Sequence, residues 1–487
     1  MNPAVRATKI VATLGPASSS AEQIAALVAA GVDVFRLNFS HGSAQDHLGR
    51  AALIREAAAA HHRDVGILAD LQGPKIRVGK FAQGKVFLQG GARFRFDIDC
   101  TEGDETRVGL DYPELVNDVH AGDTLLLNDG LISMRVEAVA PRTIDCTVLE
   151  GGVLSDRKGI NRQGGGLSAP ALTDKDKADL LVAAQMQADY LAVSFPKSAA
   201  DMQEAQALLD AAGSKALTIA KIERVEAIEN LAEIVEASRG IMVARGDLAV
   251  EVGDAAVPAL QKKMIRLARE LNRVTITATQ MMESMISSPV PTRAEVSDVA
   301  NAVLDGTDAV MLSAETAAGA YPVRTVEAMV RICLEAEKFA DRTLDSHFLN
   351  RTFSRVDQSI AMASLFTARH LDVKALVALT QSGATALWMS RLNAGVPIYA
   401  LTPEETSRRR MALYRDVEPL VFDFEGTDRE TLLAQAEQRL VDAGVVQAGD
   451  RIIVTIGEPI GQSGGTNTMK IVQVSAQPSA RFSPHNP

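Results

Sequence analysis

The side chains with the clearest chemical potential stand at the ends of short apolar runs of the chain. They are Arg36, Asn38, Ser40, His41, Asp70, Lys221, Glu223, Gly246, Asp247, Thr277, Thr279, Gln280, Ser313 and Glu315. Lys221 and Glu223 are two residues apart, so in a strand their side chains point to the same side. One such pair is compatible with a structural ion pair. The recurrence of polar groups at successive run ends instead predicts a functional site, because burying polar groups is costly.

The residue types at these run ends favour a metal and a polyanion. Glu223 and Asp247 are hard oxygen ligands without histidine or cysteine support, which favours Mg²⁺ or Mn²⁺ over zinc. Positive charge against a polyanion would come from Arg36, Arg77, Lys158 and Lys221. A divalent metal with Arg and Lys clamps is the equipment of phosphoryl transfer, which depends mainly on positioning and charge neutralisation. No Walker A motif occurs, so a P-loop nucleotide site is excluded.

The apolar runs predict the strands that position these groups. We predict strands at Lys9–Leu14, Val34–Phe39, Val65–Leu71, Tyr190–Phe195, Leu217–Glu223, Ile241–Asp247, Val274–Met281 and Ala309–Glu315. Helical patterns alternate with them. Ser19 with Glu22, and Thr292 with Glu295, predict capping boxes at two of the helix starts. Eight strand–helix units predict an α/β fold, a (β/α)8 TIM barrel whose strand ends carry the chemistry.

Two further domains are predicted from changes in the pattern. Between residues 73 and 169 strand-like alternation and an Asn128-Asp129-Gly130 turn predict a small β-barrel domain inserted as a lid. The catalytic barrel then comprises 1–72 and 170–345, close to the roughly 250 residues typical of this fold. Alternating helical and strand patterns in residues 346–487 predict a C-terminal α/β domain. Its expected elements are helices at Ser359–Leu371, Ala384–Asn393 and Arg429–Ala443 and strands at Ala375–Thr380, Pro397–Thr402 and Arg451–Ile456.

Composition narrows the classes of partner. A formal net charge of -11 disfavours nucleic acid and anionic membranes as partners. The three cysteines, Cys100, Cys146 and Cys333, are far apart and predict reduced structural thiols. The first residues lack the apolar stretch of a signal peptide, and no run approaches the length of a membrane span. We therefore expect a cytoplasmic protein.

Seven stretches resemble the pyruvate kinase family, in the order in which that family carries them. They are TKIVATLGPAS at 8–18, VFRLNFSHG at 34–42, AKIER at 220–224, MVARGDL at 242–248, ITATQMMESM at 276–285, PTRAEVSDVANAVLDGTDAVMLSAET at 291–316 and TNTM at 466–469. The resemblance covers essentially the whole chain. It implies transfer of a phosphoryl group between phosphoenolpyruvate and ADP, giving pyruvate and ATP, in a homotetramer. One departure is Ala249, where the family commonly has glycine.

The resemblance also implies roles for the residues at the run ends. Arg36 grips the transferred phosphoryl group, and Lys221 neutralises charge on that group and on the enolate. Glu223 and Asp247 hold the metal. Thr279 lies near the face where enolpyruvate is protonated, either by this residue or by a water relay.

Other implied contacts concern the substrate carboxylate and the nucleotide. The backbone amides of Gly246 and Asp247 receive the carboxylate. Ser313 and Glu315 contact or order groups and water around the substrate, or they have a purely structural role. The nucleotide phosphates meet Asn38, Ser40, His41, Arg77 and Lys158, the last two from the inserted domain as it closes.

The terminal domain resembles the family's regulatory domain. Thr380, Ser382, Gly383 and Thr385 stand between a predicted strand and helix, where hydroxyls and amides form a phosphate cradle or a simple N-cap. We expect a sugar-phosphate effector there. The glycine-rich segment Glu458–Gly465 would close over it and favours a sugar monophosphate over fructose 1,6-bisphosphate. Arg293 would bridge the barrels of two protomers, or lie solvated in a helical first turn.

One family feature differs here. Many members need K⁺, held near Asn38, Ser40, Asp70 and the next residue, which here is Leu71. Those enzymes carry glutamate where this chain has Lys75. The ammonium of Lys75 would fill the electrostatic role of K⁺, so we expect K⁺ not to be required. The alternative is a solvated lysine.

Three alternative functions are compatible with parts of the sequence. An aldolase or a dikinase domain would share the barrel, but the inserted β-domain disfavours the former and no phosphohistidine domain supports the latter. A catalytically silent paralogue that senses sugar phosphates is the alternative from another functional class. Intact Lys221, Glu223, Asp247 and Thr279 argue against it.

Overall fold

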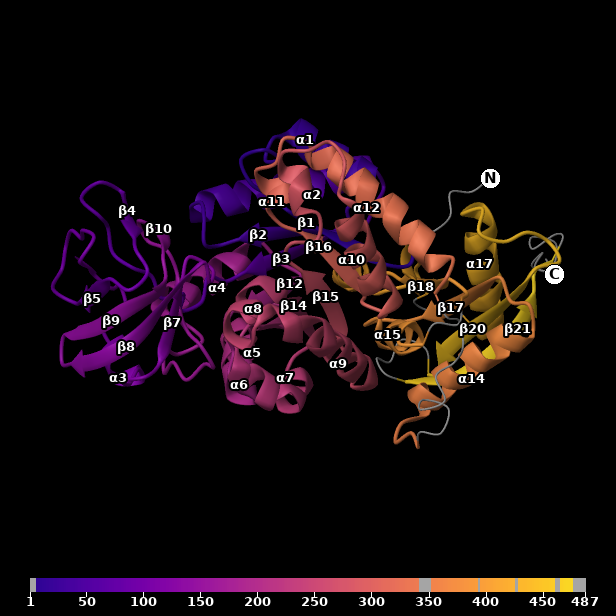
Figure 1. Cartoon of the computed structure of the whole chain (residues 1–487). Coiled ribbons are helices and arrows are strands. Elements are labelled where there is room, and N and C mark those ends of the chain that lie inside the picture. Colours follow the sequence, from indigo (N-terminus) through magenta and orange to yellow (C-terminus); the bar gives the residue numbers. More distant parts are fainter. Residues whose placement is uncertain (1–5, 341–351, 393–394, 425–427, 460–464, 476–487) are drawn as a thin grey trace, which may run out of the picture.

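A closed barrel of eight parallel strands forms the centre of the protein (Figure 1). The computed structural model describes residues 6–340, 352–392, 395–424, 428–459 and 465–475. The strands, in spatial order, are β1 (Lys9–Thr13), β16 (Ala309–Leu312), β15 (Val274–Ala278), β14 (Gly240–Ala244), β13 (Leu217–Ile222), β12 (Tyr190–Val193), β3 (Gly66–Asp70) and β2 (Val34–Asn38). The predicted (β/α)8 barrel is confirmed.

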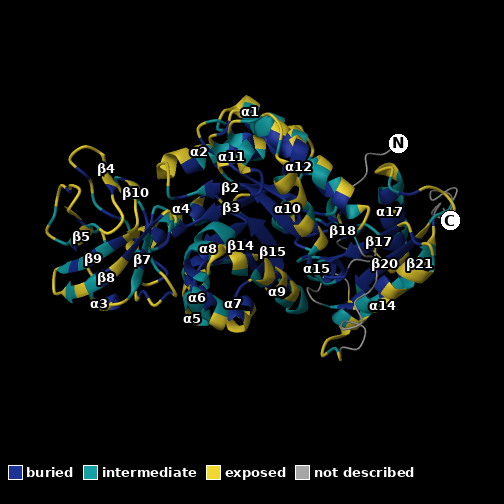
Figure 2. Ribbon diagram, viewed as in Figure 1, coloured by how far each residue is buried: buried dark blue, intermediate teal, exposed yellow. Residues whose placement is uncertain are grey.

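Helices follow each barrel strand and cover the barrel. They are α1 (Ala21–Ala30), α2 (Ala44–Ala60), α4 (Asp174–Gln185), α5 (Ala199–Ala211), α6 (Val225–Glu229), α7 (Leu231–Ala237), α8 (Arg245–Val252), α9 (Val257–Glu270), α10 (Arg293–Leu304), α11 (Ala314–Ala317) and α12 (Pro322–Glu337). Two short 3₁₀ helices, Asp254–Ala256 and Glu283–Ile286, lie between them. The strands are buried while the helices expose their outer faces (Figure 2), as expected for a parallel sheet covered by helices.

The predicted strands overrun the observed ones at the carboxyl end by one to three residues. The overrun is three residues at Asp247, Met281 and Glu315, and Asp247 lies in helix α8 and not in a strand. The reason is that the chain leaves the barrel at the level where the polar residues begin. The capping box at Thr292 and Glu295 is confirmed. The box expected at Ser19 is wrong, because Ser20 caps α1 and the Ser19 hydroxyl donates to Gly15 O.

An inserted β-domain follows β3. Its six-stranded sheet runs in the order β11 (Ile160–Arg162), β7 (Thr124–Leu127), β8 (Ile132–Ala140), β9 (Thr143–Glu150), β5 (Arg93–Asp97) and β6 (Arg107–Val108). A second sheet pairs β4 (Lys85–Leu88) with β10 (Gly152–Ser155), and α3 (Leu115–Asp118) lies beside them. Asn128, Asp129 and Gly130 all have positive φ in the turn between β7 and β8, which confirms the predicted hairpin.

The C-terminal domain is a five-stranded sheet on the opposite side of the barrel from the inserted domain (Figure 1). Its elements are α14 (Val356–His370), β17 (Ala375–Leu379), α15 (Ala384–Ser390), β18 (Ile398–Thr402), α16 (Glu405–Met411), β19 (Val417–Val421), α17 (Arg429–Asp442), β20 (Arg451–Gly457) and β21 (Thr466–Gln473). Helix α16 and strands β19 and β21 were not predicted from the sequence. Pro419 made the segment of β19 look unlike a strand. A proline is tolerated there because β19 is an edge strand.

Side chains inside the barrel and in the C-terminal domain share one hydrophobic core, which includes Leu68, Tyr190 and Met389. A buried ion pair joins the two parts: Arg391 Nη1 lies 2.9 Å from Asp308 Oδ2, directly before β16. Arg409 Nε lies 3.0 Å from Asp189 Oδ1 in the same interface. Among the helices of the described ranges, none is long and apolar enough to cross a membrane.

Candidate active site

Lys221 is the centre of a buried cluster of charges at the carboxyl end of the barrel. Its Nζ lies 3.0 Å from Glu223 Oε1 and 3.2 Å from Asp70 Oδ1. The same atom donates to Ser194 Oγ at 2.7 Å. The side chains of both carboxylates are 1% exposed. The strands β3, β12 and β13 that carry or precede these groups are neighbours in the barrel, so their ends meet by construction.

Arg36 extends the cluster from β2. Its Nε lies 2.6 Å from Asp70 Oδ2, and its Nη1 donates to Thr13 Oγ1 at 3.1 Å. Asp70 is therefore held by two cations on its two oxygens, and both cations lie at the mouth of the barrel. A polyanion arriving there would meet Arg36 and Lys221 together.

Burial and charge act against each other on the pKa values of the cluster. Burial works to raise the pKa of Asp70, but Lys221 and Arg36 outweigh it and hold the pKa below its usual value. Burial works to lower the pKa of Lys221, but Asp70 and Glu223 outweigh it and raise the pKa. Lys221 is therefore a fixed ammonium near neutral pH. It can neutralise charge but cannot act as a base.

Glu223 differs from Asp70 in the same cluster. Burial raises the pKa of Glu223, and repulsion by Asp247 and Asp70 adds to this, while Lys221 opposes it. Its Oε2 accepts a hydrogen bond from Phe195 N at 2.9 Å. Glu223 is thus the carboxylate whose negative charge the surrounding cations balance least, and a further cation beside it would be stabilised.

Helix α8 places Asp247 beside this cluster. Asp247 Oδ1 lies 3.2 Å from Lys75 Nζ, which comes from the segment leading into the inserted domain. Arg245 anchors the start of the helix through Asp298 Oδ1 at 2.7 Å and Thr279 O at 2.7 Å. The amide of Gly246 donates to Thr279 Oγ1 at 2.9 Å. Asp247 is thus held at a helix start that faces the barrel mouth.

Thr279 has a strained backbone directly after β15. Its φ is 67°, and the φ of the next residue, Gln280, is 53°. Positive φ at two consecutive non-glycine residues is costly and is concentrated at functional sites. The Thr279 hydroxyl donates to Ala278 O at 2.7 Å while it accepts from Gly246, so its position is fixed.

The donor set at this place fits a magnesium or manganese ion. Glu223 and Asp247 supply carboxylate oxygens. Glu223 directly follows β13, and Asp247 lies in α8, which directly follows the neighbouring strand β14 at the same end of the barrel. No group of three or more His, Cys, Asp or Glu side chains suited to a metal occurs among the described residues. Two protein carboxylates completed by substrate oxygens and water are a usual Mg²⁺ arrangement.

Comparison with known proteins decides the family. The barrel-domain model of pyruvate kinase matches residues 5–326, and its alpha/beta-domain model matches residues 358–472. The chain belongs to the pyruvate kinase family. It is therefore an enzyme, a phosphotransferase of glycolysis.

Individual members of the pyruvate kinase family are similar along nearly the whole chain. Pyruvate kinase II of Salmonella typhimurium is 50% identical over 97% of this chain and 100% of its own. Pyruvate kinase of Haemophilus influenzae is 49% identical over 94% of this chain and 97% of its own. The crystal structure of a pyruvate kinase from Cryptosporidium parvum is 34% identical, with a TM-score of 0.91, and covers 96% of both chains.

The predicted nucleotide residues belong to two parts of the chain, the barrel and the inserted domain. Asn38 is the last residue of β2, and its side chain accepts a hydrogen bond from Ser40 N at 3.1 Å. His41 is exposed. Arg77 and Lys158 lie in the inserted domain on adjacent segments, because Arg77 pairs with Gly159 in an antiparallel bridge. Both side chains are partly exposed.

Ser313 and Glu315 follow β16, and Glu315 has a structural function. Its buried carboxylate accepts from Ser313 N at 2.7 Å and from Met282 N at 3.2 Å. It therefore ties the loop after β16 to the loop after β15, which carries Thr279.

The predicted effector cradle joins β17 to α15 in the C-terminal domain. The amide of Gly383 donates to Thr380 Oγ1 at 3.0 Å. Gly383 has φ of 80°, and a Cβ there would lie 2.8 Å from Met411 Sδ, so only glycine fits. The buried hydroxyls of Thr385 and Thr466 are 2.6 Å apart. The segment Glu458–Gly465 falls partly outside the described residues, at 460–464.

Two residues of the charged cluster, Ser194 and Thr13, were not among those predicted from the sequence. Ser194 follows β12 directly and thus carried the same end-of-strand signal that identified Asp70. Thr13 is the last residue of β1 and binds Arg36. Leu71 is buried behind the cluster.

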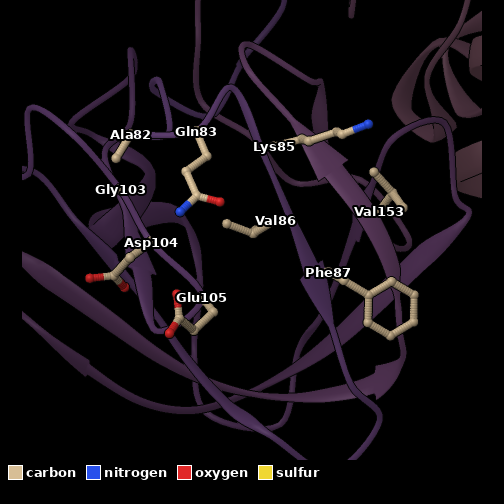
Figure 3. A pocket seen from close by; sticks show the side chains of 9 residues that line it. All are labelled: Ala82, Gln83, Lys85, Val86, Phe87, Gly103, Asp104, Glu105 and Val153. Atoms are coloured by element: carbon tan, nitrogen blue, oxygen red, sulfur yellow. The ribbon is translucent and has the colours of Figure 1, made fainter.

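A cavity of about 310 Å³ lies elsewhere, within the inserted domain (Figure 3). Its walls include Gln83, Lys85, Phe87, Glu105 and Val153. None of the predicted site residues lines it, so it has no part in the site described above.

Proposed function

We propose that this chain transfers the phosphoryl group of phosphoenolpyruvate to ADP, with Lys221, Arg36 and Thr279 as its catalytic residues. The observation that carries the proposal is the buried cluster in which Lys221 Nζ contacts both Asp70 and Glu223 beside Asp247. A permanent ammonium among carboxylates suits charge neutralisation of a moving phosphoryl group.

Each residue of the site then has a defined task. Arg36 binds the phosphoryl group, Lys221 neutralises the phosphoryl group and the enolate, and Thr279 lies at the protonation face. The amides of Gly246 and Asp247 bind the substrate carboxylate at the start of α8, and Ser313 contacts the substrate. The nucleotide phosphates contact Asn38, Ser40, His41, Arg77 and Lys158 when the inserted domain closes.

Glu223 and Asp247 would hold the divalent metal, Mg²⁺ or Mn²⁺. When bound, the metal supplies positive charge to substrate oxygens on which negative charge develops. The chain's own contribution is to present two carboxylates whose mutual repulsion is relieved by a cation.

The alternative function is a silent sensor of sugar phosphates. The intact charged cluster disfavours it, since a sensor has no need of two buried carboxylates, Asp70 and Glu223, around a lysine. A coupled assay of pyruvate formation from phosphoenolpyruvate and ADP separates the two functions. Pyruvate formation supports the enzyme, and its absence in folded protein supports the sensor.

We propose that K⁺ is not required, because Lys75 supplies the monovalent charge. The Lys75 ammonium lies 3.2 Å from Asp247, and Lys75 Cε would lie 3.2 Å from a Cβ at Gly159, so the side chain is held at the site. The enzyme should be fully active with Mg²⁺ and tetramethylammonium as the only monovalent cation. Lys75→Glu should make the rate rise about tenfold on addition of K⁺.

The matched control is Lys80→Glu, an exposed charge reversal in the inserted domain. This variant should remain independent of K⁺. The idea is wrong if the parent enzyme loses activity in tetramethylammonium and regains it with K⁺.

We propose a sugar-phosphate effector site at Thr380, Ser382, Gly383 and Thr385, with a monophosphate favoured. Support comes from the path between this cradle and the active site. Helix α15 begins at the cradle, and Arg391 directly after it pairs with Asp308 at the start of β16. The far end of β16 leads to Ser313.

Ser382→Asp should abolish activation, because the added carboxylate repels a phosphate. We expect sugar monophosphates to lower the phosphoenolpyruvate concentration for half-maximal rate by about 5–50-fold in the parent and by less than about twofold in the variant. Ser359→Asp, on the exposed start of α14, is the control and should respond like the parent. Normal activation of the Ser382 variant by every sugar phosphate that activates the parent would place the effector elsewhere.

We further propose a cytoplasmic homotetramer with domain boundaries at 1–72 with 170–345, 73–169 and 346–487. Helix α10 supports an intersubunit role, since it exposes Arg293 and Val296 on one surface. Arg293 is the residue that we expect to bridge two barrels.

A further inference from the structure

Glu251 is a buried carboxylate one helical turn beyond Asp247. The two residues are four apart in α8, so their side chains lie on the same face of the helix. Glu251 is 4% exposed. It contributes nothing to the cluster around Lys221, and the mechanism above does not use it.

The carboxylate of Glu251 binds the segment that carries Glu223. Its Oε2 accepts a hydrogen bond from Val225 N at 3.0 Å. Val225 begins α6 and stands two residues after Glu223. One carboxylate therefore joins the helix of Asp247 to the strand end of Glu223.

The inserted domain contacts the same carboxylate. The side chain of Asn161, in β11, acts on Glu251 as a hydrogen-bond donor, and α8 packs against β11. Helices α6 and α8 lie on the side of the barrel that faces the inserted domain (Figure 1). Glu251 thus has one partner in the barrel, Val225, and one in the inserted domain, Asn161.

Neighbouring groups fix the surroundings of Glu251. Arg224 donates to Leu167 O at 3.4 Å and lies over the ring of Phe195, 5.1 Å from its centroid. Glu226 accepts from Gly166 N at 2.5 Å. A Cβ at Gly165 would lie 2.9 Å from the Glu226 carboxylate, so the segment 165–166 packs tightly against Glu226.

Keeping a carboxylate at this place is costly. Burial raises the pKa of Glu251 to about 7, and repulsion by Glu226 adds to it, while the Val225 amide, Arg224 and Asn161 oppose it. A costly buried charge with partners on two separate segments is typical of a positioning group.

We propose that Glu251 is a positioning residue that sets the separation of Glu223 and Asp247 by joining α8 to the start of α6. This inference rests on the proposed metal role of those two carboxylates. Without Glu251, α8 and the end of β13 lose their direct link, and the two ligands lose their fixed spacing.

The test is Mn²⁺ binding to the full-length, metal-free enzyme without substrates, measured by electron paramagnetic resonance. Glu251→Ala should raise the Mn²⁺ dissociation constant about tenfold, as loss of a ligand-supporting partner does. The Mg²⁺ concentration for half-maximal activity should rise by a similar factor, with kcat at saturating Mg²⁺ within about threefold of the parent. Glu251→Gln keeps an oxygen for Val225 N and should give an intermediate rise; it decides the question if the alanine variant does not fold.

Glu226→Gln is the matched control, because it neutralises a neighbouring, partly exposed carboxylate and leaves the hydrogen bond between Glu251 and Val225 N in place. It should bind Mn²⁺ like the parent. The proposal is overturned if the folded Glu251 variant binds Mn²⁺ within twofold of the parent, or if Glu226→Gln weakens binding as much. Asp247→Asn separates failure of the positioning role from failure of the proposed metal site. If it leaves Mn²⁺ binding unchanged, Asp247 is not a metal ligand.

Discussion

Lys221→Met is expected to lower kcat for pyruvate formation by about 10²–10³-fold, as removal of one preorganised charge at a transition state does. Lys221 is the cation shared by Asp70 and Glu223, at 3.2 and 3.0 Å. Its loss also leaves two buried carboxylates without their common partner, which destabilises the fold by about 3–5 kcal/mol. Steady-state kinetics and thermal unfolding measure the two effects separately.

Two further variants make this prediction decisive. Lys262→Met removes an exposed lysine that pairs with Asp305 and should leave kcat unchanged. Lys221→Arg keeps the positive charge and the stability, but a guanidinium does not reproduce the compact contacts to three oxygens, so kcat should still fall about a hundredfold. A folded Lys221→Met variant with kcat within tenfold of the parent would refute the role given to Lys221.

Asp247→Asn is expected to weaken metal binding and activity together. The substitution is nearly isosteric and removes a charge that faces Glu223 and Lys75. We expect the Mg²⁺ requirement to rise at least about tenfold and kcat to fall about 10²-fold, because a neutral amide is a poor Mg²⁺ ligand. Mn²⁺ binding and Mg²⁺ titrations of the rate measure both effects.

The control for this variant is Asp254→Asn. Asp254 is exposed just after α8, and its carboxylate accepts only a local hydrogen bond from Ala255 N at 2.7 Å in the described structure. It should behave as the parent does. An unchanged Mg²⁺ dependence of Asp247→Asn would remove Asp247 from the metal site.

The barrel was predictable because its strands are continuous apolar runs with turn residues at both ends. All eight runs became barrel strands, and Asp70 and Glu223 were found from their position at run ends. The same rule placed Asp247 in a strand, which is wrong by three residues. The chain turns into α8 at Arg245, and anchoring of Arg245 by Asp298 and Thr279 O depends on residues distant in sequence.

Contacts between residues distant in the sequence could not be predicted from it. Lys75 and Asp247 are 172 positions apart, and no periodicity relates them. The contact of Glu251 with Val225 joins the last turn of α8 to the start of α6, and an isolated glutamate in a helix gives the pattern of a solvated side chain. Ser194 directly follows β12, so its position could have indicated a site residue. A single hydroxyl is too common to be selected on position alone, and its contact with Lys221 is visible only in the structure.

The most direct test of the account is the stoichiometry of the reaction with Mg²⁺ and tetramethylammonium as the only cations supplied. Pyruvate and ATP are measured in parallel after phosphoenolpyruvate and ADP are mixed with the enzyme. We predict pyruvate and ATP in equal amounts, no pyruvate when ADP is omitted, and a rate lowered about 10²–10³-fold by Lys221→Met. Pyruvate without ATP, or no pyruvate from the folded parent protein, would contradict it.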